Sequence, residues 1–211
     1  TSAAARIAFG KLFNAGQTCL APDYALVHED QVEAFVKGFV QAAGRYYPTI
    51  RDNPDYTCII NSRHYERIQG LLDGAVESGA EIVRVLPAGE ELSSEVRKIP
   101  PTLVLGASRE MAIMQEEIFG PVLPVIPYRD VDEAIHFINS ADRPLAFYYF
   151  DHRGSRGDDV IARTMSGGVC LNETLMHYAQ EGLPFGGVGA SGMGTYHGHA
   201  GFRTFSHERA I

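Results

Sequence analysis

Apolar residues recur at helical spacing in several stretches of the chain, and each stretch predicts an amphipathic helix. They cover residues 3–13, 30–46 and 62–78. The second stretch carries its apolar residues at Val32, Phe35, Val36, Phe39, Val40 and Ala43. Positions three or four apart share one helix face. A capping-box pattern predicts a further helix over 130–139, and residues 158–165 are expected to form another.

Short apolar runs bounded by glycine, proline or acidic residues predict the strands. These runs are residues 24–28, 81–86, 102–105, 122–127, 145–150 and 168–172. Pro124 has no N–H to donate to a ladder, so the fourth run is expected near a sheet edge or end. Residues 202–207 are read as a terminal strand. Because strands and helices alternate, the sequence predicts an open α/β sheet, largely parallel and covered by helices.

Composition is that of an ordinary globular protein, with 45% apolar and 21% charged residues in a chain of 211. Neither a repeat nor a linker is visible. We therefore expect one catalytic domain over residues 1–200, including a long glycine-rich loop at about 173–200. Residues 201–211 are expected to form a tail, with a strand used in oligomerisation.

The net charge of −8 argues against nucleic acid as a partner. No uninterrupted apolar run approaches the roughly 20 residues that cross a bilayer. Three cysteines, at Cys19, Cys58 and Cys170, do not make a disulfide framework, so a reducing cytoplasm is the expected location. We expect Cys19 alone to be readily alkylated, because Cys58 and Cys170 lie within apolar runs.

Cys19 is the first candidate for chemistry. It follows a helix that Asn14-Ala15-Gly16 should end, and it comes shortly before Pro22. A nucleophile needs an exposed sulfur on a backbone that is held still, and such a turn provides both. Taken alone, the residue also suits a small buried hydrophobe, so both readings stay open at this point.

Three longer motifs change that balance. They are Asn14-Ala15-Gly16-Gln17-Thr18-Cys19, Gln115-Glu116-Glu117-Ile118-Phe119-Gly120-Pro121-Val122 and Pro184-Phe185-Gly186-Gly187-Val188-Gly189-Ala190-Ser191-Gly192. In order and spacing they resemble the aldehyde dehydrogenase superfamily. Residues 59–65, 144–146 and 196–207 resemble its class 3 branch, and most closely the bacterial coniferyl aldehyde dehydrogenase group. The resemblance covers essentially the whole chain and implies the fold of an aldehyde dehydrogenase catalytic domain.

The resemblance also implies a reaction, the NAD(P)-dependent oxidation of an aldehyde to a carboxylic acid. Cys19 would be the nucleophile that forms a thiohemiacetal and then a thioester. Glu117 would accept hydrogen bonds from the nicotinamide ribose, and Phe119 would pack beside the nicotinamide ring. Phe185 would line the aldehyde pocket, and Asn172 would order the loops around the site. The alternatives are a capping carboxylate for Glu117, core packing for Phe119 and Phe185, and a purely structural role for Asn172.

Two other patterns are set aside. Residues 187–192 fit G-x-G-x-x-G, but a dinucleotide fingerprint follows a strand and opens a helix, which this segment is not expected to do. His197 and His199 lack a third ligand nearby, so no metal site is expected.

Parts that the family requires are not found in these 211 residues: a Rossmann unit, the general-base glutamate and the oxyanion asparagine. We therefore expect a C-terminal catalytic portion without its N-terminal cofactor domain, inactive alone and associating as a homodimer or higher oligomer. Neither the aldehyde nor the choice between NAD and NADP is defined. The alternatives are a cysteine-dependent esterase or acyl-transfer enzyme, and a non-catalytic assembly module.

Overall fold

The computed structural model describes residues 2–211 and divides the chain into two compact units, one ending at Arg129 and the other beginning at Asp130. The division falls between strand β4 (Val122–Tyr128) and helix α4 (Val131–Asn139). The sequence carries no linker composition at this point, so the boundary was not expected.

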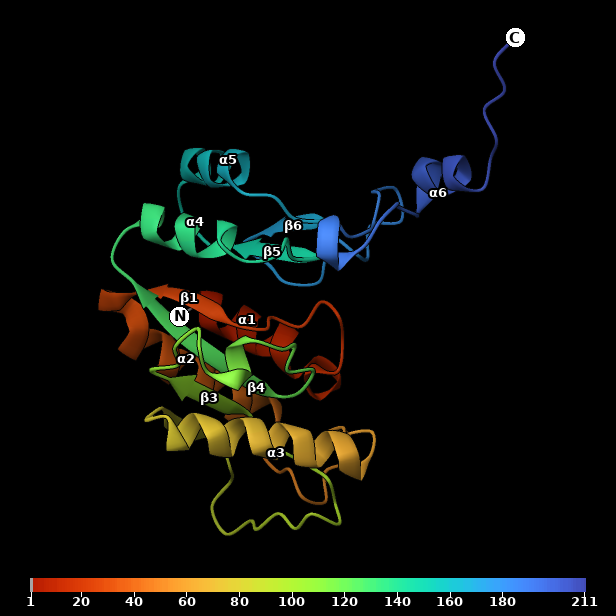
Figure 1. Ribbon diagram of the computed structural model, residues 1–211. Helices are drawn as coiled ribbons and strands as arrows, with labels where there is room; N and C mark the ends of the chain where they lie inside the picture. Colours follow the sequence, from red (N-terminus) through yellow and green to blue (C-terminus); the bar gives the residue numbers. More distant parts are fainter. Residues whose placement is uncertain (1) are drawn as a thin grey trace. The chain divides into compact units, whose positions relative to one another are not determined.

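A four-stranded sheet organises the first unit (Figure 1). Its elements are α1 (Ser2–Leu12), β1 (Ala25–His28), α2 (Val32–Tyr46), α3 (Ser62–Glu77), β2 (Glu81–Arg84), β3 (Thr102–Leu105) and β4, with 3-10 turns η1 (Phe13–Gly16), η2 (Glu29–Gln31) and η3 (Ala112–Met114). The strand order is β1-β4-β3-β2. The pairs β1–β4 and β3–β4 are parallel, and β2 joins the edge antiparallel to β3.

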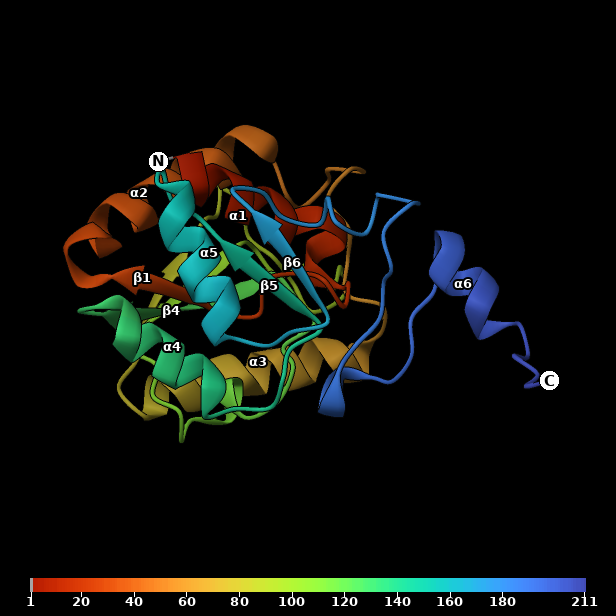
Figure 2. The ribbon, with the colours of Figure 1, turned by 90° about the horizontal axis from the view of Figure 1, so that it is seen from above.

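Helices cover both faces of this sheet, as Figures 1 and 2 show. One buried cluster joins α1 and α2 to the sheet through Leu103 and Leu123. The other joins α3 to the opposite face through Val104 and Val122. Neighbouring strand residues point to opposite faces, so consecutive apolar residues supply both clusters. The predicted open, largely parallel and helix-covered α/β sheet is confirmed.

Strand β4 lies in the middle of the sheet, whereas its Pro124 predicted an edge or end. The register explains the difference. Pro124 pairs with Val104 of β3, and the ladder with β1 begins one residue later, at Val125. Pro127 likewise pairs with β1 beyond the end of the β3 ladder. Each proline therefore has an unpaired side toward which its missing N–H can point.

Asn61 caps the start of helix α3, because its side-chain oxygen accepts a hydrogen bond from the His64 N–H at 2.9 Å. This cap satisfies one of the free N–H groups in the first turn. It fixes the start of a helix that carries Arg67, a residue that contributes to the candidate site described below.

The second unit contains α4, β5 (Ala146–Tyr149), α5 (Gly154–Arg163), β6 (Gly168–Leu171), a 3-10 turn η4 (Gly189–Ser191) and α6 (Gly198–Thr204). Strands β5 and β6 are parallel and joined through α5. Asp130 accepts a hydrogen bond from the Glu133 N–H at 2.9 Å and so caps α4, which is one half of the predicted capping box.

Two elements of this unit differ from expectation. Helix α5 begins four residues before the predicted start at 158, because Gly154 and Gly157 read as loop residues although Gly157 is buried against Tyr149 and Leu171. The strand expected over 202–207 overlaps helix α6 instead. Its glycines, Gly198 and Gly201, lower helix propensity and hide the helix in the sequence.

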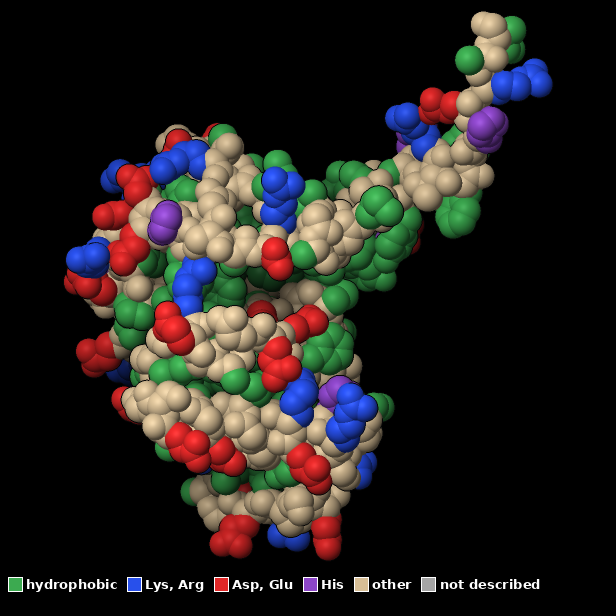
Figure 3. Space-filling view, in the orientation of Figure 1, with side chains coloured by type: hydrophobic (Ala, Val, Ile, Leu, Met, Phe, Trp, Pro, Cys, Tyr) green, Lys and Arg blue, Asp and Glu red, His purple; other side chains and the backbone are tan. Residues whose placement is uncertain are grey.

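Charge and length of the helices bear on possible partners. On the face of α3 drawn in Figure 3, acidic side chains are interspersed with Lys and Arg, and that face shows no continuous basic patch. Within residues 2–211, no helix is both long enough and apolar enough to cross a membrane.

Candidate active site

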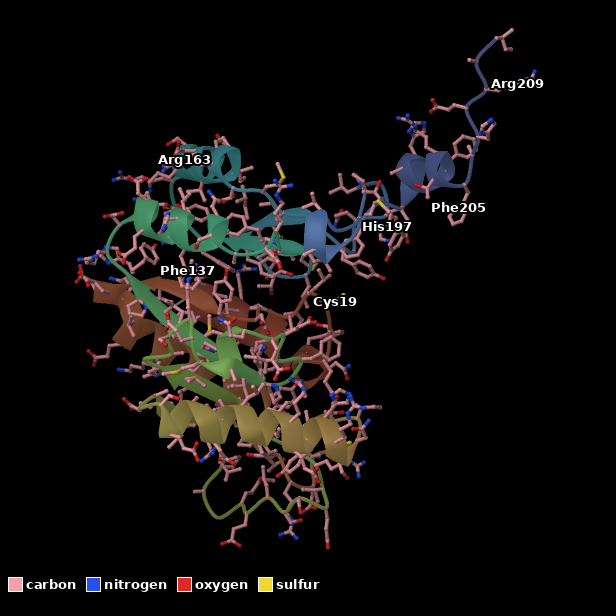
Figure 4. All side chains as sticks on the ribbon, in the orientation of Figure 1. Cys19, Phe137, Arg163, His197, Phe205 and Arg209 are labelled. Carbon is pink, nitrogen blue, oxygen red and sulfur yellow. The ribbon has the colours of Figure 1, made fainter. Side chains whose placement is uncertain are left out.

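Cys19 lies on an exposed turn that follows α1 (Figure 4). The backbone leaves the helix through Asn14, Ala15 and Gly16, which all have positive φ, at 51°, 51° and 72°. Left-handed conformations cost roughly 1–2 kcal/mol for a residue with a side chain, so this path needs support from its surroundings. A second turn, closed by the Ala21 N–H and the Thr18 carbonyl at 3.1 Å, holds Cys19 itself. The predicted exposed, constrained turn is confirmed.

Gly16 brings this turn against the second motif. A Cβ on Gly16 would lie 2.2 Å from the carbonyl oxygen of Gly120, and one on Gly120 would lie 2.6 Å from Cδ1 of Ile68. No side chain fits at Gly16 without displacing backbone. Two of the three motifs, about a hundred residues apart in the sequence, are therefore in direct contact.

Asp23 ties the same two segments together. Its Oδ1 accepts a hydrogen bond from the Ile118 N–H at 3.1 Å. Asp23 lies four residues after Cys19, and Ile118 follows Glu117. No sequence pattern predicted this contact, because an acidic residue in a loop suggests only a solvated position.

Glu117 and Phe119 are both exposed, and Ile118 between them is completely buried. This alternation leaves a carboxylate and an aromatic ring accessible two residues apart on one segment. Phe119 has φ 50° and a side chain that is 40% exposed. A bulky residue in the left-handed region is a backbone outlier, and such outliers cluster at functional sites.

Arg67 of α3 holds the backbone around Glu117 in place. Its Nη1 donates to the Glu117 carbonyl at 3.3 Å, and its Nη2 donates to the Ile118 carbonyl at 2.5 Å. Nη1 also lies 3.6 Å from the carboxylate of Glu116. Glu116 therefore points to Arg67, which leaves Glu117 as the carboxylate of this pair that is not bound by the guanidinium. Nothing in the sequence singled out Arg67.

Lys11 is a buried cation beneath these segments. Its side chain is fully buried in the last turn of α1, and Nζ has no hydrogen-bond partner among residues 2–211. Burial lowers the pKa of Lys11 to about 8, against the attraction of Asp23 and Glu117, which raises it. Burial and Asp23 raise the pKa of Glu117, while Lys11 and Arg67 act in the opposite direction.

Asn172 belongs to the second unit, where it joins the ends of β5 and β6. Its Oδ1 accepts from the Asp151 N–H and its Nδ2 donates to the Asp151 carbonyl, both at 2.9 Å. It has φ 56°, a conformation that asparagine tolerates better than most residues. Burial raises the pKa of Asp151, but hydrogen bonds from Arg156, the Arg153 N–H and Tyr149 prevail and lower it to about 2.

Phe185 also belongs to the second unit and lies at the centre of an aromatic cluster. It is largely buried, and its backbone forms a two-way bridge with Tyr196 at 2.9 Å. Its ring contacts His177, Tyr178, Tyr196 and His197, with centroid distances from 5.0 to 6.1 Å.

The glycines after Phe185 permit tight packing of the loop. A Cβ on Gly186 would lie 2.1 Å from the Gly194 carbonyl, and one on Gly187 would lie 2.1 Å from the Ser191 carbonyl. The G-x-G-x-x-G segment, residues 187–192, contains only the three-residue turn η4 and does not open a long helix. Close backbone approach within this loop therefore accounts for these two glycines.

A family model described as "Aldehyde dehydrogenase family" matches residues 1–211. The chain is 56% identical over 211 residues to a probable coniferyl aldehyde dehydrogenase of Caulobacter vibrioides, covering 100% of this chain and 44% of the relative. It is 48% identical over 209 residues to the coniferyl aldehyde dehydrogenase of Pseudomonas sp. strain HR199, covering 99% of this chain and 44% of the relative.

Solved structures agree with the sequence relatives. The substrate-bound state of Staphylococcus aureus AldH matches with a TM-score of 0.89 and 44% identity, over 99% of this chain and 44% of that one. A Mycobacterium tuberculosis aldehyde dehydrogenase complexed with NAD+ matches with a TM-score of 0.83 and 26% identity, over 97% and 42%. The chain spans less than half the length of each protein. With the family model matched from end to end, the chain belongs to the aldehyde dehydrogenase family.

Proposed function

We propose that the protein oxidises aldehydes to carboxylic acids with NAD or NADP, through a covalent intermediate on Cys19. The segment around Cys19, residues 14–23, is called the Cys19 turn. The observation that carries the proposal is the contact between this turn and the Glu117–Gly120 segment. Gly16 packs against Gly120, and Asp23 binds the Ile118 N–H. An exposed thiol and an exposed carboxylate are thereby carried on two segments that are fixed to each other.

Cys19 acts first in this mechanism. Its sulfur bonds to the aldehyde carbon, the carbonyl π electrons move to oxygen, and a thiohemiacetal oxyanion results. Backbone N–H groups on a held turn suit such an oxyanion, and the Cys19 N–H is the first candidate donor. The thiol transfers its proton to solvent water before the attack, and the exposed position of Cys19 gives water access to the sulfur.

Glu117 and Phe119 would hold the cofactor. The Glu117 carboxylate can accept hydrogen bonds from ribose hydroxyls, and the exposed Phe119 ring can pack beside the nicotinamide. A nicotinamide cofactor supplies the hydride acceptor that converts the Cys19 thiohemiacetal to a thioester. Water then cleaves the thioester, which releases the carboxylic acid and restores the thiol.

Aromatic aldehydes such as coniferyl aldehyde are the proposed substrates. Two relatives, at 56% and 48% identity, carry coniferyl aldehyde dehydrogenase names. The ring cluster around Phe185 supports the same choice, because aromatic side chains favour stacked or edge-on contacts with aromatic ligands. In this proposal Phe185 lines the aldehyde pocket, and Asn172 orders the loop that carries it.

We also propose how the protein is organised. Residues 1–200 form the catalytic part, residues 201–211 form a tail that takes part in a homodimer or higher oligomer, and the protein works in the cytoplasm. The relatives are more than twice as long as this chain. We propose that residues matching their remaining length supply the main cofactor-binding domain, the general base and the oxyanion asparagine.

The test is a chimera in which this chain replaces the matching 211 residues of the Caulobacter vibrioides relative. We expect NADH or NADPH formation with coniferyl aldehyde, a higher kcat/KM for it than for aliphatic aldehydes, and no activity after Cys19→Ala. The 211-residue chain alone should form no reduced cofactor. A folded chimera that is inactive, or that keeps full activity without Cys19, would contradict the proposal.

A cysteine-dependent esterase is the second candidate, because an exposed free thiol such as Cys19 is also able to attack an activated ester. Steady release of p-nitrophenol from p-nitrophenyl acetate by the chain without nicotinamide, lost in Cys19→Ala, would favour it over aldehyde oxidation.

A further inference from the structure

Gln17 connects the Cys19 turn to a distant segment through its side-chain amide. Nε2 donates to the Asn14 carbonyl at 3.2 Å and to the Cys58 carbonyl at 3.1 Å. Oε1 accepts from the Ile60 N–H at 3.0 Å. One amide thus uses both its donors and its acceptor, and two of the three bonds cross more than forty residues of sequence.

Residues 58–60, to which the Gln17 side chain is hydrogen-bonded, are themselves held in place. Ile59 is buried, its N–H donates to the Arg97 carbonyl at 2.8 Å, and its carbonyl accepts from Arg97 Nε at 3.2 Å. Asn61, the next residue but one, caps α3. Residues 58–60 therefore form a rigid anchor, whereas the Cys19 turn lies at the surface and contains left-handed residues that local interactions do not favour.

We propose that Gln17 is a positioning residue that holds the Cys19 turn in its reactive conformation by anchoring it to residues 58–60. The proposal rests on the role of Cys19 in the proposed function. Only a side chain with a donor and an acceptor at this length makes all three bonds, since a carboxylate cannot donate to Cys58 and a thioether offers neither strong donor nor strong acceptor. Without the anchor, the turn samples other conformations, and attack on a carbonyl loses its alignment.

The test compares Gln17→Met with the unaltered 211-residue chain. Methionine keeps the length of the side chain and removes the three bonds. Gln41→Met is the matched control, because Gln41 is an exposed residue of α2 and receives the same chemical change. The readouts are amide hydrogen exchange at Gln17 and Ala21, whose N–H groups bond to Asn14 and Thr18, and the pH profile of Cys19 alkylation.

We expect Gln17→Met to speed exchange at both amides at least about tenfold and to displace the alkylation profile of Cys19. The profile of Cys170 in the second unit should stay unchanged, and Gln41→Met should alter neither. In the chimera, Gln17→Met should lower kcat at least about tenfold and leave the KM for the aldehyde within about twofold.

Unchanged exchange and alkylation at the Cys19 turn would overturn the proposal. So would equal acceleration throughout the chain, which would mean that Gln17 only stabilises the fold. A third outcome is that Gln17→Met loosens the turn as expected while a Cys19→Ala chimera stays fully active. In that case Gln17 does anchor the turn, but the proposed function of Cys19 is wrong. The two failures are therefore distinguishable.

Discussion

Gly16 and Gly120 face each other so closely that a Cβ on Gly16 would lie 2.2 Å from the Gly120 carbonyl oxygen. This contact joins the segment that carries Cys19 to the segment that carries Glu117. A change at either glycine therefore alters the relative placement of two candidate functional groups, and it does so without removing either of them.

Gly16→Ala tests this contact. Gly16 has φ 72° and no space for a Cβ, so alanine adds left-handed strain and a backbone clash, and we expect a loss of stability above about 3 kcal/mol. Gly79→Ala is the control, because Gly79 has φ 94° and nothing within 4 Å of a Cβ. It should lose only about 1–2 kcal/mol. Urea unfolding measures both, and equal losses would show that the contact with Gly120 is unimportant.

Lys11→Met tests the buried cation. The folded-state pKa of Lys11, about 8, lies below its ordinary value of 10.5, so the unfolded chain binds more protons between these values. Stability of the unaltered chain should therefore rise with pH across this window, by up to about 3 kcal/mol relative to the variant. Lys11→Met should be the more stable protein at pH 7, and this advantage should shrink toward pH 10.

Lys37→Met is the control for that experiment, because Lys37 is exposed on α2. Urea unfolding at a series of pH values gives the comparison, in which the titration of tyrosines common to all three proteins cancels. A Lys11→Met protein with the same pH dependence as the unaltered chain would rule out a destabilising buried charge.

Arg67→Met should loosen the segment that carries Glu117. The variant loses two donors, to the Glu117 and Ile118 carbonyls, with an expected cost of about 1–3 kcal/mol. Hydrogen exchange over residues 116–120 should accelerate, and in the chimera the KM for the nicotinamide nucleotide should rise more than kcat falls. Arg63→Met, at an exposed position of the same helix, should change neither quantity.

Asn172→Ala and Asn172→Gly separate the contribution of the Asn172 hydrogen bonds from that of its left-handed backbone conformation. Both variants lose the hydrogen bonds to the Asp151 backbone, at about 1–2 kcal/mol. Glycine accepts φ 56° without strain, whereas alanine does not, so alanine should be the less stable by about 1 kcal/mol. Thermal unfolding of the two variants checks the order, and equal stabilities would show that the backbone conformation is relaxed.

The sequence predicted most helices and strands of the first unit because their apolar residues follow the period of the element they form. Helix α3, for example, begins at the residue expected and ends one residue early. It also predicted that Cys19 lies on an exposed turn, because glycine and proline at fixed offsets restrict the backbone locally. Periodicity and turn residues are local properties of the sequence, so they can be recognised without knowledge of the fold.

Contacts across the fold were not predictable in the same way. Arg67, Asp23 and Lys11 act on the Glu117 segment only because three elements distant in sequence meet there. A surface arginine, a loop aspartate and a helical lysine give no local signal of such a role. The early start of α5 and the presence of α6 were not predicted for a related reason. Their glycines are typical of loops in the sequence, although these residues are helical in the folded protein.

The two prolines of β4 have a consequence for the chain before its sheet is complete. Val122–Tyr128 reads Val-Leu-Pro-Val-Ile-Pro-Tyr, and without prolines such an uncharged apolar strand would suit the stacked, self-complementary pairing of amyloid. Pro124 and Pro127 have no backbone N–H, so the strand lacks the continuous row of N–H donors that this pairing requires. They remain compatible with the native sheet because each lies beyond the end of one of its two ladders. This long apolar strand is thereby protected against aggregation before the neighbouring strands have paired with it.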